Sequence, residues 1–193
     1  MSTTDKPVLF LDVDGVLNSF GKSPWDLTVA HNVFYAPHGM AYKIRTSTLI
    51  GKALMELDIE IRWLTTWRDD APTHIAELAG LPRDLDVAFT HEQYDELLNN
   101  EDPFALDWGS GTPWKLRTVL SFIREEQGRP FIWADDAAVP KDAKALATEV
   151  DFEGFDIPPH LLIRPDGDIG LTPEHIQEMR EFLDSLPKSK DLP

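Results

Sequence analysis

The chain alternates short apolar runs with longer stretches of helical periodicity, and this alternation sets the strongest constraint on its fold. The apolar runs occupy residues 8–11, 59–64, 87–89, 131–134 and 161–163. Runs this short and partly β-branched are typical of buried strands in a parallel sheet. Parallel strands must be joined by crossover connections, which are usually helices. The pattern therefore predicts an α/β fold, in which helices cover both faces of a central, mainly parallel, five-stranded sheet.

The stretches between these runs carry helix signals. One of them begins with Thr112 and Pro113, a capping hydroxyl followed by proline in the first turn, and ends at Gly128, a natural C-terminal cap. Because 193 residues suffice for one domain of ordinary size, we expect a single domain over residues 1–193. By the same signals, helices are predicted over residues 46–57, 72–79, 112–128, 140–150 and 172–186.

Two connections interrupt the alternation. Between residues 18 and 45, extended segments over 33–36 and 40–44 flank a Pro-His-Gly turn and predict a hairpin. Residues 90–111 form a long connection that carries six acidic residues and no lysine or arginine. A connection of this length is typical of a functional lid or a mobile segment.

The amino-acid composition of the chain excludes several classes of function. The chain has 18 lysine and arginine residues and 34 aspartate and glutamate residues, so its formal net charge is −16. This charge disfavours non-specific nucleic-acid binding, because such binding needs a basic surface. The chain has no cysteine, which excludes disulfides, thiolate metal sites and a cysteine nucleophile.

No apolar run approaches the roughly 20 residues that span a bilayer. Since the first residues also lack the features of a signal peptide, we expect a soluble, cytoplasmic protein with no membrane partner.

Polar residues follow three of the predicted strands at the point where each strand ends. They are Asp12 and Asp14 after the first strand, Thr65 and Thr66 after the second, and Asp135 and Asp136 after the fourth. Ligands of open parallel sheets bind at the carboxyl ends of the strands, so we expect these side chains to converge. Carboxylates that converge repel one another unless a cation lies among them. Oxygen ligands without histidine or cysteine suit Mg²⁺, which is therefore the predicted cofactor.

Lys115 lies in the first turn of the helix expected over residues 112–128. A cation is unfavourable at this end of a helix, because the helix dipole is positive there. Its position indicates an anion nearby. A lysine, hydroxyl groups, a helix N-terminus and Mg²⁺ together predict a phosphate site.

Taken in order along the chain, these residues resemble the haloacid dehalogenase (HAD) superfamily of phosphotransferases. The matching segments are DVDGVLN at residues 12–18, LTTW at 64–67, Lys115, and WADD at 133–136. The resemblance implies a HAD-like Rossmannoid three-layer sandwich with a small flap, at about residues 18–45, in place of a large cap domain. More loosely, the chain resembles the phosphatase domains of nucleic-acid repair enzymes. The aspartate at position 14, which the superfamily's phosphatases use and its dehalogenases lack, indicates hydrolysis of phosphate esters.

The resemblance also implies roles for individual residues. Asp12 would be the nucleophile and a Mg²⁺ ligand, and Asp14 would be the general acid/base, with its peptide oxygen also on Mg²⁺. Lys115 would neutralise the phosphate and Asp12, while Asp135 and Asp136 would hold Mg²⁺, with either one as the direct ligand. Thr65 would hydrogen-bond the transferring phosphoryl group, with Thr66 as the alternative. The implied substrate-binding residues are Gly15, Thr66 and Trp67.

The implied reaction is Mg²⁺-dependent hydrolysis of a phosphomonoester through an aspartyl-phosphate on Asp12. The substrate is either a phosphorylated small molecule or a phosphorylated nucleic-acid end. For a nucleic-acid end, a local basic patch would have to offset the negative field, and its candidate residues are Lys43, Arg45, Arg62 and Arg68. Two other interpretations stay open: a phosphotransferase with an acceptor other than water, and a catalytically idle acidic binding module. The sequence does not indicate the oligomeric state.

Overall fold

The core of the molecule is a five-stranded parallel sheet. In the computed structural model, which describes residues 6–35, 39–99, 113–139, 146 and 156–187, the strand order is β5-β4-β1-β6-β7. Every neighbouring pair in this sheet is parallel. The strands are β1 (Val8–Leu11), β4 (Glu60–Trp63), β5 (Asp86–Val87), β6 (Phe131–Ala134) and β7 (His160–Ile163). The predicted α/β sheet is confirmed, although the third apolar run contributes only the two residues of β5.

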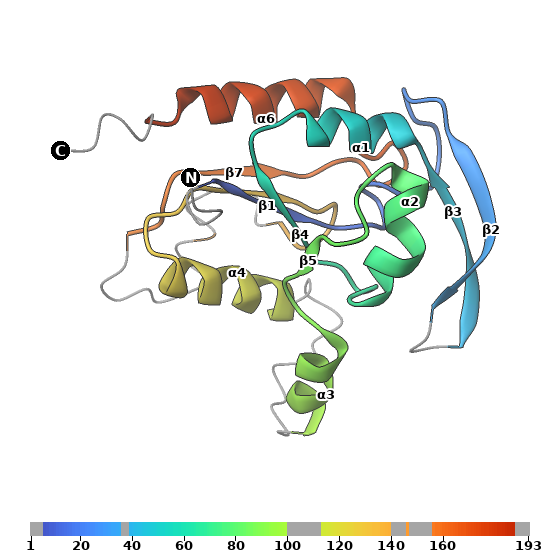
Figure 1. Ribbon diagram of the computed structural model, residues 1–193, viewed down its shortest axis with the longest axis horizontal. Helices are drawn as coiled ribbons and strands as arrows, with labels where there is room; N and C mark the ends of the chain where they lie inside the picture. Colours follow the sequence, from blue (N-terminus) through green and yellow to red (C-terminus); the bar gives the residue numbers. More distant parts are fainter. Residues whose placement is uncertain (1–5, 36–38, 100–112, 140–145, 147–155, 188–193) are drawn as a thin grey trace.

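Successive residues of the central strand β1 face opposite layers of helices. Leu9 and Leu11 belong to a core cluster with the apolar faces of α1 (Thr48–Met55) and α6 (Pro173–Ser185). Val8 and Phe10 belong to a second cluster with α4 (Pro113–Glu125). The strand is therefore apolar at every position because both of its faces are buried. Figure 1 shows α1 and α6 on one side of the sheet and α4 on the other.

Side-chain caps fix the starts of the helices on the first side. The Ser47 hydroxyl accepts a hydrogen bond from the Leu49 amide at the start of α1. Thr172 caps α6 in a reciprocal arrangement with His175, and proline occupies the first turn. The helix expected over residues 72–79 is present as a short π-helical segment, Ala71–Ile75, that continues into α2 (Ala76–Ala79).

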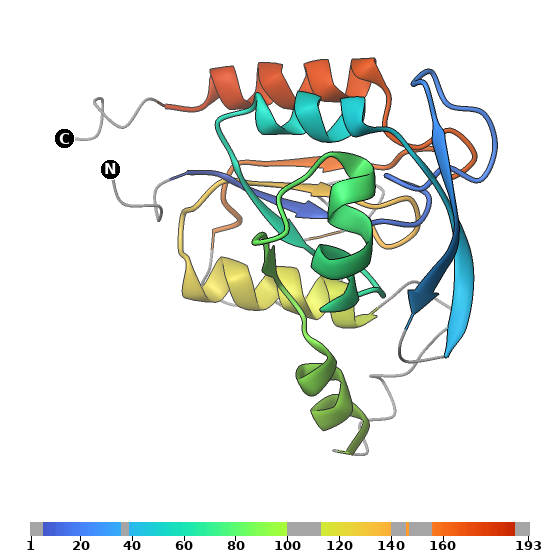
Figure 2. The same ribbon diagram turned by 45° about the vertical axis from the view of Figure 1, so that its right-hand side comes forward.

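A β-hairpin stands at the carboxyl ends of the sheet strands. Its antiparallel strands are β2 (Thr28–Tyr35) and β3 (Met40–Thr46), and they form a separate two-stranded sheet. The hairpin predicted between residues 18 and 45 is present, with longer strands than expected, and residues 36–38 lie outside the described residues. Figures 1 and 2 show it running across the end of the sheet toward which β1 points.

The long acidic connection predicted over residues 90–111 contains a helix in its first part. His91–Asn99 form α3, which projects away from the sheet in Figure 1. The helix begins at a reciprocal cap: the Gln93 amide donates to the Thr90 hydroxyl at 3.2 Å, and the Gln93 side chain accepts from the Thr90 amide at 2.8 Å. The T-x-x-Q pattern of this capping box is a helix signal. Residues 100–112, and most of the helix predicted over 140–150, lie outside the described residues.

The packing of α1 on α2 predicts an unusual response to a glycine substitution. A Cβ on Gly51 would stand 2.2 Å from the backbone oxygen of Ala79. Alanine normally stabilises a helix interior by about 1 kcal/mol relative to glycine. Here we expect Gly51→Ala to lower the free energy of unfolding, by about 1–3 kcal/mol, because the backbones must separate. Urea denaturation measures the change.

Lys52→Ala is the matched control, because Lys52 is exposed on the same helix. It should change the free energy of unfolding by no more than about 0.5 kcal/mol. A Gly51→Ala chain as stable as the parent would show that the two helices are not packed this closely.

Candidate active site

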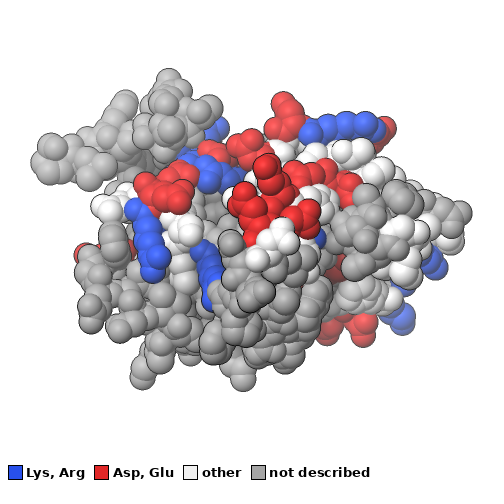
Figure 3. Space-filling view, turned by 90° about the horizontal axis from the view of Figure 1, so that it is seen from below, with Lys and Arg blue, Asp and Glu red and all other residues white. Residues whose placement is uncertain are grey.

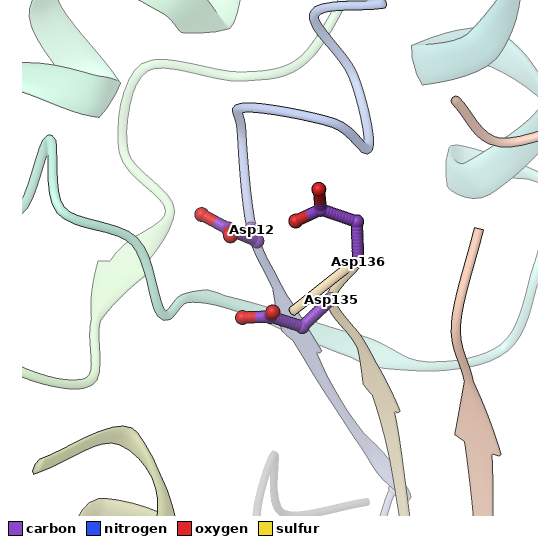
Figure 4. Close-up of side chains that lie close together, drawn as sticks. All are labelled: Asp12, Asp135 and Asp136. Atoms are coloured by element: carbon purple, nitrogen blue, oxygen red, sulfur yellow. The ribbon is translucent and has the colours of Figure 1, made fainter. Parts of the chain in front are cut away.

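The three predicted metal-binding carboxylates meet at the carboxyl edge of the sheet. Asp12 directly follows β1, and Asp135 and Asp136 directly follow the neighbouring strand β6. Their side chains offer oxygens that all lie within 4.8 Å of one another. Figure 4 shows the three side chains side by side where the two strands end. The parallel pairing of β1 with β6 is what brings together residues more than 120 positions apart in the chain.

Lys115 reaches into this cluster from the first turn of α4. Its ammonium lies 2.6 Å from Asp12 Oδ2 and 2.6 Å from Asp135 Oδ2, and the side chain is almost fully buried. The unfavourable position of Lys115 on the helix indicated a nearby anion. The protein itself provides this anion, as the carboxylates of Asp12 and Asp135. One cation therefore bridges the ends of β1 and β6.

The charges at the site do not balance. The pKa of Asp12 is raised to about 8, chiefly by burial and also by the neighbouring Asp135 carboxylate, against the opposing effects of Lys115 and of a hydrogen bond from Thr65. Burial and the charge of Asp135 also raise the pKa of Asp136. Three carboxylates face a single ammonium, so the cluster favours binding a further cation.

Asp135 and Asp136 differ in how their oxygens are used. Asp135 is fully buried, its Oδ2 accepts from Lys115, and its Oδ1 accepts from the amides of Ala137 and Ala138 at 2.9 and 2.5 Å. Asp136 is half-buried and lies between two glycines. A Cβ on Gly15 would stand 2.2 Å from Asp136 Oδ2, and a Cβ on Gly167 would stand 2.8 Å from it.

The two glycines therefore let the Asp136 carboxylate pack directly against the backbone, and a larger residue at either position would collide with it. Gly15 is further required by its φ of 73°. A cluster of three carboxylates with excess negative charge fits Mg²⁺, which prefers oxygen ligands. Sequence reasoning took Gly15 as a substrate-binding residue, and the structure places it against Asp136.

Asp14 is held by hydrogen bonds to both of its oxygens. The Asn18 side-chain amide donates to Oδ1 at 2.7 Å, and Trp67 Nε1 donates to Oδ2 at 2.9 Å. Asn18 in turn accepts a hydrogen bond from the Arg45 amide on β3 at 2.8 Å. Asn18 therefore ties the hairpin to Asp14. Sequence reasoning assigned it no role, and the only signal was its place at the end of the DVDGVLN segment.

The two threonines after β4 occupy different environments. Thr65 is buried, hydrogen-bonds Asp12, and accepts from the Trp67 amide at 3.3 Å. Thr66 is half-buried. Trp67 is 3% exposed and lies behind Asp14. The structure therefore brings Thr65 to the site and gives Trp67 a contact with Asp14, while substrate contacts from Thr66 and Trp67 stay predictions.

Arg68 links the site to α3 and α4. It is buried, has a φ of 46°, and its guanidinium lies 3.7 Å above the ring of Tyr94 and 5.5 Å from the ring of Trp114, which precedes Lys115. A positive φ is uncommon for a residue with a side chain, so the surrounding contacts must hold it. Nothing in the sequence singled out this arrangement.

The candidate basic patch is not assembled as a free surface. Arg62 pairs with Glu60 and Glu126, and Arg68 stacks on aromatic rings. The Arg45 guanidinium donates to the backbone oxygens of Phe20 and Gly21. Seen from below, acidic and basic side chains of the described residues lie next to one another (Figure 3).

Comparison with known proteins gives one family match. The family model described as "HAD domain in Swiss Army Knife RNA repair proteins" matches residues 8–176. This range begins with β1, ends within α6, and includes every residue of the site described above. No curated protein and no solved structure matches the chain. Among the described residues, no helix is long and apolar enough to cross a membrane.

The charge imbalance predicts a stability response to Mg²⁺. We expect saturating Mg²⁺ to raise the Tm by roughly 5–10 °C, because a ligand at 100 times its Kd contributes about 2.7 kcal/mol, and each kcal/mol shifts a chain of this size by about 2–4 °C. Asp136→Asn should abolish this rise. Without Mg²⁺ the variant should be at least as stable as the parent, because a repulsion with Asp135 is removed. Calorimetry with and without Mg²⁺ measures both effects.

Asp184→Asn, an exposed change on α6, is the control and should keep the full Mg²⁺ response. The same rise in Asp136→Asn as in the parent would exclude Asp136 as a ligand. A parent chain that does not respond to Mg²⁺ would exclude the metal site.

Proposed function

Because the chain belongs to the family of HAD domains of Swiss Army Knife RNA repair proteins, we propose that it is a Mg²⁺-dependent phosphomonoesterase. The observation that carries the proposal is the buried cluster of Asp12, Lys115, Asp135 and Asp136 at the sheet edge, with Asp14 two residues beyond Asp12. A binding module has no need for a buried carboxylate cluster with excess negative charge and a pre-oriented acid beside it. The arrangement therefore favours an enzyme over an idle module.

The proposed chemistry has two steps, both in line with a covalent nucleophile. In the first step, an oxygen of Asp12 attacks the phosphorus, and the bond from the phosphorus to the oxygen of the leaving group breaks. Asp14 donates a proton to the oxygen of the leaving group. In the second, Asp14 takes a proton from a water molecule, which attacks the phosphorus. The bond to Asp12 then breaks and inorganic phosphate leaves. The hydrogen bonds from Asn18 and Trp67 support this role, because they hold Asp14 in one orientation.

The remaining residues provide charge and position. Lys115 neutralises Asp12 and the incoming phosphoryl group, and the Thr65 hydroxyl is close enough to Asp12 to bind that group as well. Asp12, Asp136 and the peptide oxygen of Asp14 would hold Mg²⁺. When bound, the ion stabilises negative charge on the phosphoryl oxygens. Asp135 is fully buried and accepts three hydrogen bonds, so we assign it to positioning Lys115, whereas we assign the half-buried Asp136 to direct metal binding.

For the substrate we favour a phosphorylated RNA end over a free metabolite. The support is the description of the matched family, which names RNA repair proteins. The net charge of −16 opposes extended contact with a polyanion, and the described arginines of the candidate patch are engaged within the protein. Both facts are compatible with a site that receives only the terminal phosphate and its nearest nucleotide.

The nucleophile assignment predicts loss of turnover without loss of the fold. Asp12→Asn is nearly isosteric, and we expect it to lower phosphate release by at least about 10³-fold, on the scale seen when covalent nucleophiles are removed. Phosphate release with Mg²⁺ from oligoribonucleotides carrying a 5′- or 3′-phosphate measures this. Borohydride reduction during turnover should convert position 12 of the parent to homoserine, which mass spectrometry detects.

Circular dichroism should show the same folded state for Asp12→Asn as for the parent, and Asp184→Asn should retain full activity. Phosphate release by Asp12→Asn at the parent rate would remove Asp12 as the nucleophile.

The hydrogen bond from Trp67 to Asp14 predicts that removing the donor lowers kcat and leaves KM nearly unchanged. Trp67→Phe keeps an aromatic ring and removes the Nε1–H donor, and we expect kcat to fall by about 10- to 100-fold with KM within about twofold. The reason is that a hydrogen bond to a charged group contributes about 1.5–3 kcal/mol, and about 1.4 kcal/mol is tenfold in rate. Steady-state kinetics with a phosphorylated oligoribonucleotide measures both constants.

Trp63→Phe is the control. Trp63 is fully buried on β4, and its Nε1 has no hydrogen-bond partner, so the substitution removes the same atoms without removing such a bond. Equal kcat values for the two variants would show that Trp67 does not position Asp14.

A further inference from the structure

Phe20 is an exposed aromatic side chain at the edge of the metal-binding cluster. It is 54% exposed and is the one aromatic residue among the exposed large apolar side chains of the described residues. Exposed single apolar residues are common and need no explanation by themselves. The position of Phe20 and the anchoring of its backbone do need an explanation.

Its ring lies close to the Asp136 carboxylate. The point where a Gly167 Cβ would stand is 2.8 Å from Asp136 Oδ2 and 3.5 Å from Cδ2 and Cε2 of Phe20. The ring edge and the carboxylate thus flank the same glycine. An exposed ring in this place is positioned to contact a leaving group attached to a phosphate at the cluster.

The backbone beneath the ring is held from two sides. The Phe20 amide donates to the Gly167 oxygen at 3.0 Å, and the Gly21 amide donates to the Asp168 oxygen at 2.8 Å. From the hairpin, the Arg45 guanidinium donates to the backbone oxygens of both Phe20 and Gly21. The ring is therefore displayed from a fixed backbone, and a fixed surface loses less entropy when a ligand packs on it.

We propose that Phe20 is a stacking surface for a nucleobase on the leaving group, and that it gives the site its preference for phosphate esters of nucleosides. The inference rests on the proposed function and adds to it the part of the substrate that is recognised. Aromatic side chains stack on any base, because every base has a flat π face. Stacking also uses no charge, so it suits a rim where the Phe20 backbone is held by a segment that carries the exposed Asp166 and Asp168.

The test compares two substrates in the parent and in Phe20→Ala. One is a trinucleotide with a phosphate at the end that the parent hydrolyses, and the other is the same molecule with an abasic sugar at that terminal position. We expect Phe20→Ala to lower the ratio of kcat/KM for the base-bearing over the abasic substrate by about tenfold, the scale of one base stacked on an aromatic ring. Phe20→Trp should restore the ratio.

Met55→Ala, which removes an exposed apolar side chain from the end of α1, is the control and should leave the ratio unchanged. A mononucleotide with and without its base forms a second pair. A loss with both pairs assigns the ring to the esterified nucleoside, and a loss with the trinucleotide alone assigns it to a strand end; either supports stacking.

Two negative outcomes are distinguishable. If the parent hydrolyses both trinucleotides and Phe20→Ala leaves the ratio unchanged, the stacking inference is overturned and the proposed function stands. If the folded parent releases no phosphate from any of these esters, the proposed function fails, and the inference fails with it.

Discussion

The rest of the site depends on the buried ammonium of Lys115, shared between Asp12 and Asp135. Like charges at the ends of adjacent strands repel one another, and burial deprives them of the water that would screen the repulsion. Lys115 offsets part of this cost, and the two amides that hold Asp135 fix the geometry of the pair. The cluster still carries more negative than positive charge. The cluster is therefore able to accommodate a cation, and its three carboxylates offer oxygens within 4.8 Å of one another.

The hairpin is connected to the chemistry through a small number of polar contacts. Asn18 joins the Arg45 amide to Asp14, while the side chain of Arg45 holds the backbone of Phe20 and Gly21. The proposed acid/base and the exposed ring at the rim therefore share one anchor on β3. A movement of the hairpin would displace both together, which couples the orientation of Asp14 to the place where a leaving group would lie.

The net charge of the chain and the matched family suggest different substrates. The two agree if the site recognises only the end of a nucleic-acid strand. A net charge of −16 opposes a long polyanion, whereas the matched family belongs to RNA repair proteins. In the proposed site, a phosphate at a strand end would need only Mg²⁺ and Lys115 to balance its charge. The adjacent base needs a flat apolar surface rather than a basic field. Recognition of an end in this way is compatible with an acidic protein.

Local sequence determined much of the architecture. Apolar runs predicted the strands because both faces of each central strand are buried, and the carboxylates that follow β1 and β6 were predicted to meet because parallel strands end at one edge. The capping box at Thr90 and Gln93 was also present in the sequence, although the acidic composition of the segment masked the helix α3. Tertiary structure alone decided the contacts of Asn18, Gly167, Arg68 and Phe20. Their contacts are with Arg45, Asp136, Tyr94 and Gly167, residues distant in the chain, and no local periodicity records a contact between distant segments.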